Sequence, residues 1–175
     1  ELDLPFERED LGGPFGGNDT ARYRALNPNG KVPTIVDQDF VLWESNSCTR
    51  YLSAKHGAGT LYPDNLKTRS NAERWMDWQI STVSPTLVPV FWGLIRTPLK
   101  ERNAAEIEKA RKKLSANLSI LDTHLKNSKY IGGEKFTMGD IPIGITAYRR
   151  FNMEMEREPY QDLKRWYDLL CDRPP

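Results

Sequence analysis

The chain has 175 residues, with 25 Lys and Arg against 24 Asp and Glu. This balance argues against nucleic acid or another polyanion as the partner, because such proteins carry a clustered excess of basic residues. No apolar run approaches the length of a membrane span, no secretory signal is visible at the start, and the length suits one or two small domains.

Few residues of the chain are of the kinds that bind metals. It holds two cysteines, Cys48 and Cys171, and two histidines, His56 and His124. Their spacing matches no metal-binding or redox motif, so we expect no metal site. Two unpaired thiols are typical of a reducing compartment, which predicts a cytoplasmic protein.

The first residues predict a strand, a loop and a short helix. Residues 5–11 alternate charged and apolar side chains, which favours an edge strand. The glycine-rich stretch 12–17 predicts a loop, and two interpretations stay open: a flap over a ligand or a plain connection. Asp19 or Thr20 then caps a short helix.

The segment 27–46 carries the most specific pattern. Asn-Pro and Asn-Gly steps predict turns, and two short apolar stretches over 34–36 and 40–43 predict a strand pair. Val32-Pro33 lies after the turns and directly before the first of these apolar stretches. An X-Pro step is the common place for a cis peptide bond, and a cis bond would turn the Val32 N–H and C=O outward to pair with an extended ligand.

Three charged or polar residues lie near the ends of this pattern: Lys31 directly before the Val-Pro step, and Glu44 and Ser45 directly after the second apolar stretch. Glu44 suits an ammonium group, and Ser45, at the start of a helix over 45–56, suits a carboxylate, because the first helical N–H groups lack partners. Lys31 suits a second carboxylate. The alternative is that Glu44 and Ser45 only cap the helix and that Lys31 is only solvated.

A shift in composition divides the chain. Gly and Pro gather over 57–66, which predicts a linker between a domain over 1–56 and a domain over 67–175. Beyond the linker the apolar spacing is helical, with Pro85 and Pro89 expected to kink or break the helix. The apolar run over 90–95 is expected to line a pocket or fill the core.

The clearest helical pattern begins near Asn103. Its apolar residues lie on one stripe and its other face is charged and solvated. The stripe consists of Ile107, Ala110, Leu114, Leu118, Leu121 and Leu125.

A second motif, Phe136-Thr137-Met138-Gly139-Asp140-Ile141, opens another helix. Thr137 and Asp140 have the spacing of a capping box, with Asp in place of Glu, so we interpret Asp140 as a cap and not as a catalytic acid. The helix is expected over 141–153, where Tyr148 is expected to pack in the core, with contact to a substrate pocket as the alternative. A last amphipathic helix is expected over 160–170.

These motifs together resemble the glutathione S-transferase family, in its bacterial and theta-like members. The matching residues are Asn27-Pro28-x-Gly30-Lys31-Val32-Pro33, Glu44-Ser45-Asn46 and Phe136-Thr137-x-x-Asp140-Ile141. The resemblance covers nearly the whole chain. It implies an α/β plus all-α fold, in which an incomplete thioredoxin-like N-terminal domain precedes an all-helical C-terminal domain.

The resemblance also implies a glutathione site. In the family the residue before the cis-proline pairs with the cysteinyl backbone of glutathione, which corresponds to Val32. The Glu-Ser pair holds the γ-glutamyl end, which corresponds to Glu44 and Ser45, and Lys31 corresponds to the residue that reaches the glycyl carboxylate. Compared with the family, the chain is expected to lack the first strand, most of the first helix and a C-terminal tail. The catalytic Ser, Cys or Tyr lies at the start of that helix, so no numbered residue receives the catalytic role.

The function implied by the resemblance is an enzyme that conjugates glutathione to a hydrophobic electrophile bound between the domains. Such enzymes are homodimers, formed through the helix that carries Trp75 and the helix after it. Glutathione-dependent reduction and dehalogenation are alternatives on the same site. A further alternative is that the chain is a non-catalytic interaction module, as in translation and stress proteins. A chloride-channel-like relative is a third, but no stretch predicts a membrane helix.

Overall fold

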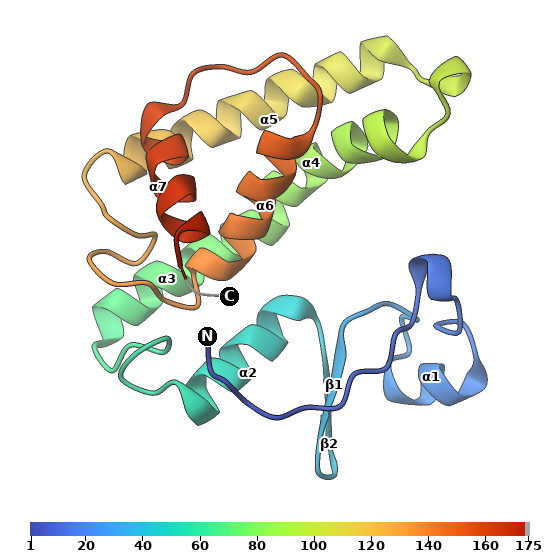
Figure 1. The fold of residues 1–175 in the computed structure, drawn as a ribbon, viewed down its shortest axis with the longest axis vertical. Helices are drawn as coiled ribbons and strands as arrows, with labels where there is room; N and C mark the ends of the chain where they lie inside the picture. Colours follow the sequence, from blue (N-terminus) through green and yellow to red (C-terminus); the bar gives the residue numbers. More distant parts are fainter. Residues whose placement is uncertain (174–175) are drawn as a thin grey trace. The chain divides into compact units, whose positions relative to one another are not determined.

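The computed structural model describes residues 1–173. The chain forms two compact units, the first over Glu1–Tyr62 and the second from Pro63 onward. The first unit is small and mixes helices with a strand pair, whereas the described part of the second contains helices and connecting loops (Figure 1). The assignment of 57–66 as a linker stays a prediction.

The first unit is built on a β-hairpin. Strands β1 (Thr34–Asp37) and β2 (Phe40–Trp43) pair antiparallel, with Thr34 opposite Trp43 and Asp37 opposite Phe40. Helix α1 (Ala21–Leu26) precedes the hairpin, and α2 (Ser45–His56) follows it and packs on both strands. Thr20 caps α1, because its hydroxyl accepts the Tyr23 N–H at 3.3 Å.

One side-chain cluster holds α2 on the turn end of the hairpin. The Tyr51 hydroxyl donates to the Asp37 carboxylate at 2.7 Å, and Lys55 forms an ion pair with the same carboxylate. The hydrogen bonds from Lys55 and Tyr51 hold the pKa of Asp37 below its ordinary value. The aromatic ring of Tyr51 also lies 5.2 Å from that of Phe40, centroid to centroid.

The strand predicted over residues 5–11 is absent, so that prediction is wrong. A strand needs a neighbour for its backbone groups, and no described segment pairs with these residues. Their charged side chains are exposed; Arg8 pairs with Asp10, and Glu9 pairs with Arg22 of α1. Charge alternation without a buried face therefore does not suffice to form a strand here.

The second unit consists of helices, two of which begin at an asparagine that caps them. Asn103 accepts the Glu106 N–H at 3.1 Å and starts the long helix, and Asn65 caps the first helix through the Thr68 N–H, also at 3.1 Å. The helices are α3 (Leu66–Trp78), α4 (Ser84–Phe91), α5 (Ala104–Leu125), α6 (Asp140–Asn152) and α7 (Gln161–Cys171).

Pro85 lies where the helix is interrupted between α3 and α4, as predicted. Pro85 lies in the first turn of α4, directly after a π-helical turn over Gln79–Val83. Because Pro85 has no N–H and its ring crowds the preceding carbonyl, the ordinary hydrogen-bond ladder is lost there and a wider turn replaces it. Pro89 lies inside α4, and a second π-helical turn, Trp92–Arg96, follows that helix.

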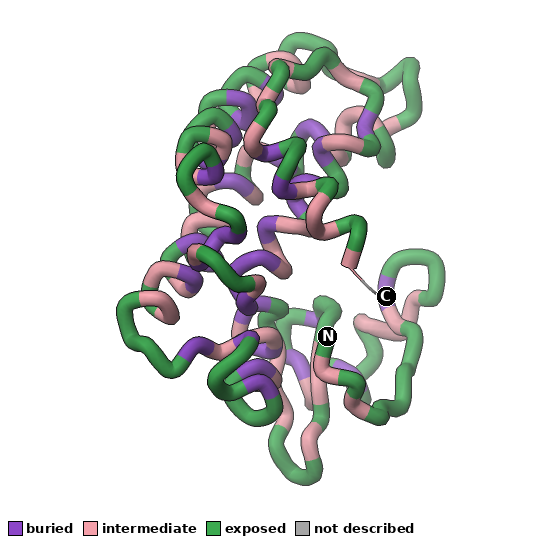
Figure 2. Tube along the Cα trace, turned by 60° about the vertical axis from the view of Figure 1, so that its left-hand side comes forward, coloured by how far each residue is buried: buried purple, intermediate pink, exposed green. Residues whose placement is uncertain are grey.

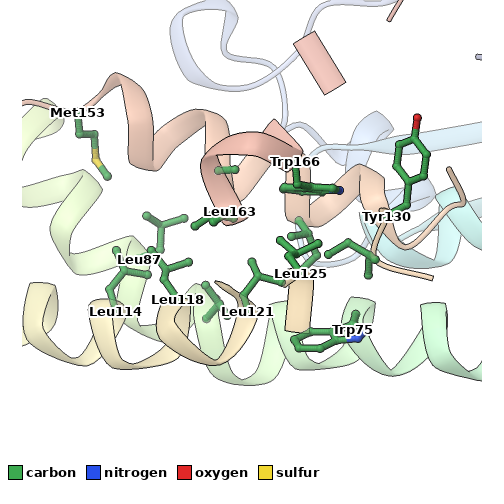
Figure 3. Packing of buried hydrophobic residues seen from close by; sticks show 14 of the residues in the cluster. Trp75, Leu87, Leu114, Leu118, Leu121, Leu125, Tyr130, Met153, Leu163 and Trp166 are labelled. Carbon is green, nitrogen blue, oxygen red and sulfur yellow. The ribbon is translucent and has the colours of Figure 1, made fainter. Parts of the chain in front are cut away.

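The apolar stripe of α5 forms the centre of the core. Leu114, Leu118, Leu121 and Leu125 are at most 1% exposed. α5 packs against α4 and α7, and α6 packs against α3 and α7. Figure 3 shows Leu163 and Trp166 of α7 close to this leucine stripe, and Figure 2 shows the buried positions recurring along the helices. Burying each leucine contributes about 1.5–3 kcal/mol, so this stripe is a main source of stability.

None of the helices in residues 1–173 has both the length and the apolar character that crossing a membrane requires.

Candidate functional site

The hairpin register places the predicted site residues at one end of the first unit. Thr34 lies opposite Trp43 at the end of the strand pair. Val32 precedes Thr34 by two positions and Ser45 follows Trp43 by two, so both lie just beyond the same end of the hairpin. Lys31, Val32, Glu44 and Ser45 are all exposed.

Val32 presents its backbone to solvent. The residue is 54% exposed, and the Val32–Pro33 peptide bond is cis. Within residues 1–173, neither the N–H nor the C=O of Val32 forms a hydrogen bond. Unpaired backbone groups next to a strand are open to an extended ligand that pairs as another strand does.

The carbonyl of the preceding residue is held from inside the unit. The Lys31 C=O accepts a hydrogen bond from the Tyr23 hydroxyl at 2.8 Å and another from Asn27 Nδ2 at 2.6 Å. Tyr23 and Asn27 are only 5% and 2% exposed. The sequence did not predict that either residue holds this carbonyl. The Asn-Pro step signals a turn at Asn27, but nothing in the sequence pairs Tyr23 with a carbonyl eight residues on.

A tight turn leads into this segment. Gly30 has φ +61°, and a Cβ there would lie 2.9 Å from the Asn18 carbonyl oxygen, so only glycine fits. Asn18 Nδ2 also donates to the Gly30 carbonyl at 2.7 Å. The Asn27-Pro28-Asn29-Gly30 turn is thereby fixed against the loop before α1.

Glu44 has an unusual backbone conformation. Its φ is 71° and its ψ is 114°, outside the regions that side-chain-bearing residues prefer. Such a conformation costs about 1–3 kcal/mol. The Glu44 side chain makes no capping hydrogen bond to α2, so the interpretation of Glu44 as only a cap is not supported. Its carboxylate is exposed beside the first turn of α2, where Ser45 begins the helix.

The second motif is closed on itself. Asp140 is fully buried and accepts hydrogen bonds from the Thr137 N–H at 2.9 Å, the Ile131 N–H at 2.8 Å and the Trp166 Nε1–H at 3.0 Å. Burial raises the pKa of the Asp140 carboxyl, and these hydrogen bonds oppose the rise. The predicted capping role of Asp140 is confirmed. The Thr137 hydroxyl differs from a capping box, because it accepts the N–H of Gly139.

Other residues that the sequence singled out lie apart from the hairpin end. Tyr148 is 56% exposed, so the expectation that it packs in the core is wrong. In the apolar run 90–95, Val90 is buried. Val90 and Leu94 line a cavity of about 380 Å³ within the second unit. Cys48 is buried, and burial raises the pKa of its thiol. A thiol with a raised pKa is a poor nucleophile.

Comparison with known proteins agrees with the architecture. A model of the glutathione S-transferase N-terminal domain matches residues 1–55, and one of the C-terminal domain matches residues 76–174. Glutathione S-transferase GstB of Escherichia coli strain K12 is 41% identical over 176 residues, covering 99% of this chain and 85% of the relative.

The chain is also similar to solved structures in three dimensions. The theta-class glutathione S-transferase of Xanthomonas axonopodis pv. citri, with glutathione bound, superposes with a TM-score of 0.90 at 46% identity, covering 93% of this chain and 78% of that one. Elongation factor 1-gamma 1 of Oryza sativa subsp. japonica is 27% identical over 160 residues, covering 90% of this chain and 38% of the relative.

An α/β thioredoxin-like unit followed by an all-helical unit is therefore the fold of this chain, as predicted. The chain belongs to the glutathione S-transferase family. The names of its similar relatives support the predicted enzyme class.

Proposed function

We propose that this chain binds glutathione along the Val32 backbone and conjugates its thiolate to a hydrophobic electrophile. Val32 pairs with the cysteinyl backbone of glutathione. Glu44 holds the ammonium of the γ-glutamyl end, and Ser45 with the first turn of α2 holds the carboxylate there. Lys31 holds the glycyl carboxylate.

One observation carries this proposal. The hairpin register brings a backbone segment with an unpaired N–H and C=O, at Val32, to the same end as an exposed carboxylate and a helix N-terminus, at Glu44 and Ser45. Glutathione has an extended backbone with an ammonium and a carboxylate at one end. Its donors and acceptors therefore match this arrangement, and the solved relative from Xanthomonas axonopodis pv. citri has glutathione bound.

The chemistry requires the glutathione thiol to ionise. A free thiol has a pKa of about 8.5, so a hydrogen-bond donor must stabilise the thiolate near neutral pH. The thiolate then forms a carbon–sulfur bond to the electrophile, the leaving group departs with the bonding pair, and the thiol proton passes to solvent. We assign no residue of this chain to the donor.

Two alternatives share parts of this site. Reduction or dehalogenation uses the same glutathione contacts and differs in the donor and the acceptor. A non-catalytic interaction module is favoured by the likeness to elongation factor 1-gamma 1. Because Lys31, Glu44 and Ser45 are all present and exposed, we favour the enzyme.

The segment after the helix that carries Trp75 supports a homodimer. Val88, Trp92 and Ile95 follow one another at helical spacing and are 43%, 58% and 52% exposed. An exposed apolar stripe of this kind is typical of a protein interface. Trp92→Glu is expected to shift the molecular mass in solution from dimer to monomer, whereas Ile145→Glu, at an equally exposed position on α6, leaves the mass unchanged. A monomeric wild-type protein would contradict the dimer.

A cytoplasmic location remains part of the proposal. It is supported by Cys48 and Cys171, which are both free thiols, as is usual in a reducing compartment.

The experiment that tests the function is a calorimetric titration with glutathione. The wild-type protein is expected to bind, and Glu44→Gln is expected to weaken binding by about 1.5–3 kcal/mol, because a charged hydrogen bond is lost. Glu134→Gln, which changes an exposed carboxylate on a loop of the second unit, serves as the matched control. An inert wild-type protein would contradict glutathione binding, and an unaffected Glu44→Gln would remove Glu44 from the site.

Binding without turnover would distinguish the module from the enzyme. An activated aryl halide is the probe, because thiolate attack releases the halide and gives a coloured conjugate. Glutathione-dependent conjugation by the wild-type protein supports the transferase. Binding with no conjugation, reduction or dehalogenation supports the module.

A further inference from the structure

We infer that Tyr23 and Asn27 are positioning residues of the glutathione site, because they fix the direction of the Val32 N–H. The inference rests on the proposed function and names two residues that do not themselves touch the ligand. Both side chains are buried beneath the segment that carries Val32 and hold the carbonyl of the residue before it.

The geometry follows from the planarity of the peptide. The Lys31–Val32 peptide bond is not among the cis bonds of the chain, so its C=O and N–H point in opposite directions within one plane. Tyr23 and Asn27 pull the C=O toward the interior of the unit, at 2.8 and 2.6 Å. The N–H of Val32 is thereby aimed away from the interior, toward the side on which Val32 is exposed.

The same two side chains also hold the residue after the Val-Pro step. The Thr34 hydroxyl lies 2.8 Å from the Tyr23 hydroxyl and 3.3 Å from Asn27 Nδ2. Tyr23 gives its one proton to the Lys31 carbonyl, and Asn27 Nδ2 gives one proton to that carbonyl and one to Thr34. The Thr34 hydroxyl then donates to Tyr23, so every donor has an acceptor.

We call Tyr23, Asn27, Thr34 and the Lys31 carbonyl the carbonyl clamp. Asn27 is itself held, because its Oδ1 accepts the Asn29 N–H at 3.0 Å. The hydrogen bonds of the clamp are part-buried, so water weakens them little. It fixes both flanks of Val32-Pro33 while leaving the Val32 N–H unpaired for the ligand.

The test compares two tyrosine hydroxyls of the same unit. Tyr23→Phe removes the clamp hydroxyl, whereas Tyr51→Phe removes the hydroxyl that binds Asp37 at the opposite end of the hairpin. We expect Tyr23→Phe to raise the Kd and KM for glutathione about two- to tenfold. We expect kcat and the KM for the electrophile to stay unchanged. The reason is that the clamp stabilises bound glutathione equally in the ground state and in the transition state. Tyr51→Phe is expected to leave all these constants as in the wild-type protein.

A second variant guards against a simple loss of folding. Asn27→Asp keeps Oδ1 but replaces the Nδ2 donor by an oxygen, which repels the Lys31 carbonyl, so its Kd for glutathione is expected to rise more than that of Tyr23→Phe. The calorimetric stoichiometry counts the folded molecules, so Kd describes the folded fraction alone. Equal affinity of Tyr23→Phe and Tyr51→Phe, or an equal effect on kcat, would overturn the inference alone. A wild-type protein that binds no glutathione would overturn the proposed function and this inference with it.

Discussion

The carbonyl clamp and the Asp140 cluster are two buried hydrogen-bond networks that differ in what they leave open. Around Asp140, each carboxylate oxygen is directed at N–H groups of the second unit and the cluster is fully buried. In the clamp, the interior groups are equally well paired, but the adjoining Val32 backbone is unpaired and exposed. A network that satisfies all its members stabilises a fold, whereas one that ends beside unpaired surface groups prepares a binding site.

The largest effect is expected from a substitution that removes the carboxylate of the Asp140 cluster. Asp140→Ala leaves the N–H groups of Ile131, Thr137 and Trp166 buried without an acceptor. Each such group costs about 1–3 kcal/mol, so we expect a loss of about 3–5 kcal/mol, measured by urea unfolding. The molecules that remain folded are expected to bind glutathione as the wild-type protein does. A glutathione affinity that falls while the unfolding free energy stays constant would mean that Asp140 serves the ligand.

A change at the exposed end of the hairpin, where α2 begins, is expected to show the opposite pattern. Ser45→Ala removes the hydroxyl of the exposed first residue of α2, a helix whose N-cap residue makes no side-chain capping hydrogen bond. We expect glutathione binding to weaken by roughly 1–3 kcal/mol, with the unfolding free energy nearly unchanged. Ser70→Ala, an exposed serine on α3, is the control. Unchanged affinity in Ser45→Ala would exclude Ser45 from the site.

A charged network in the second unit sharpens the comparison through its pH dependence. Glu158 accepts from Ser115 at 2.6 Å and pairs with Arg111 and Arg150. Burial raises the pKa of the Glu158 carboxyl, but the hydrogen bonds from Ser115 and Arg111 outweigh it, and the pKa lies below its ordinary value. A depressed pKa in the folded state means that the stabilisation is present above the unfolded pKa of about 4.3 and is lost as the pH falls through the lower folded value.

Glu158→Gln tests that sign. At pH 7 the variant is expected to be less stable by about 1–2 kcal/mol, because the ion pairs lose their charge and a hydrogen bond is weakened. The difference from the wild-type protein is expected to shrink as the pH falls below about 4.3. Unfolding by urea at several pH values measures it, and a difference that grows on acidification would contradict the assigned pKa direction.

The smallest effect is expected from Thr137→Ala. The variant loses the hydroxyl that accepts the Gly139 N–H and donates to Asp140. These two hydrogen bonds lie at the edge of the Asp140 cluster. A loss of about 1 kcal/mol in unfolding free energy is expected, with the glutathione affinity unchanged. Weaker glutathione binding at unaltered stability would show that this motif had been misinterpreted.

Local patterns were sufficient to predict most helices but not the contacts between distant residues. The leucine stripe and Asn103 predicted α5 and its start, because spacing and a cap are both read from neighbouring positions. Pro85 likewise predicted the break before α4. The strand over 5–11 was predicted wrongly, because a strand depends on a partner elsewhere. The exposure of Tyr148 was missed for a related reason, since the spacing of a helix alone does not say which neighbour covers it.

The candidate site divides in the same way. Lys31, Val32, Glu44 and Ser45 were found by motif, and the hairpin register places Val32 and Ser45 at one end. Their roles toward glutathione stay proposals. Tyr23 was missed, because its partner is a backbone carbonyl and any residue supplies one. The conformation of Glu44 was missed as well, because residues other than Gly, Asn and Asp give little sign of a positive φ.

That conformation has a consequence for anyone who sets out to make the protein more robust. Glycine tolerates the positive φ of Glu44 better than a residue with a side chain does. A selection for heat resistance alone therefore favours Glu44→Gly, and it does so by discarding the carboxylate that we assign to the ammonium of glutathione. Variants gathered from such a selection become a way of locating function: the positions where gained durability coincides with lost binding mark where this fold gives up stability to hold its ligand.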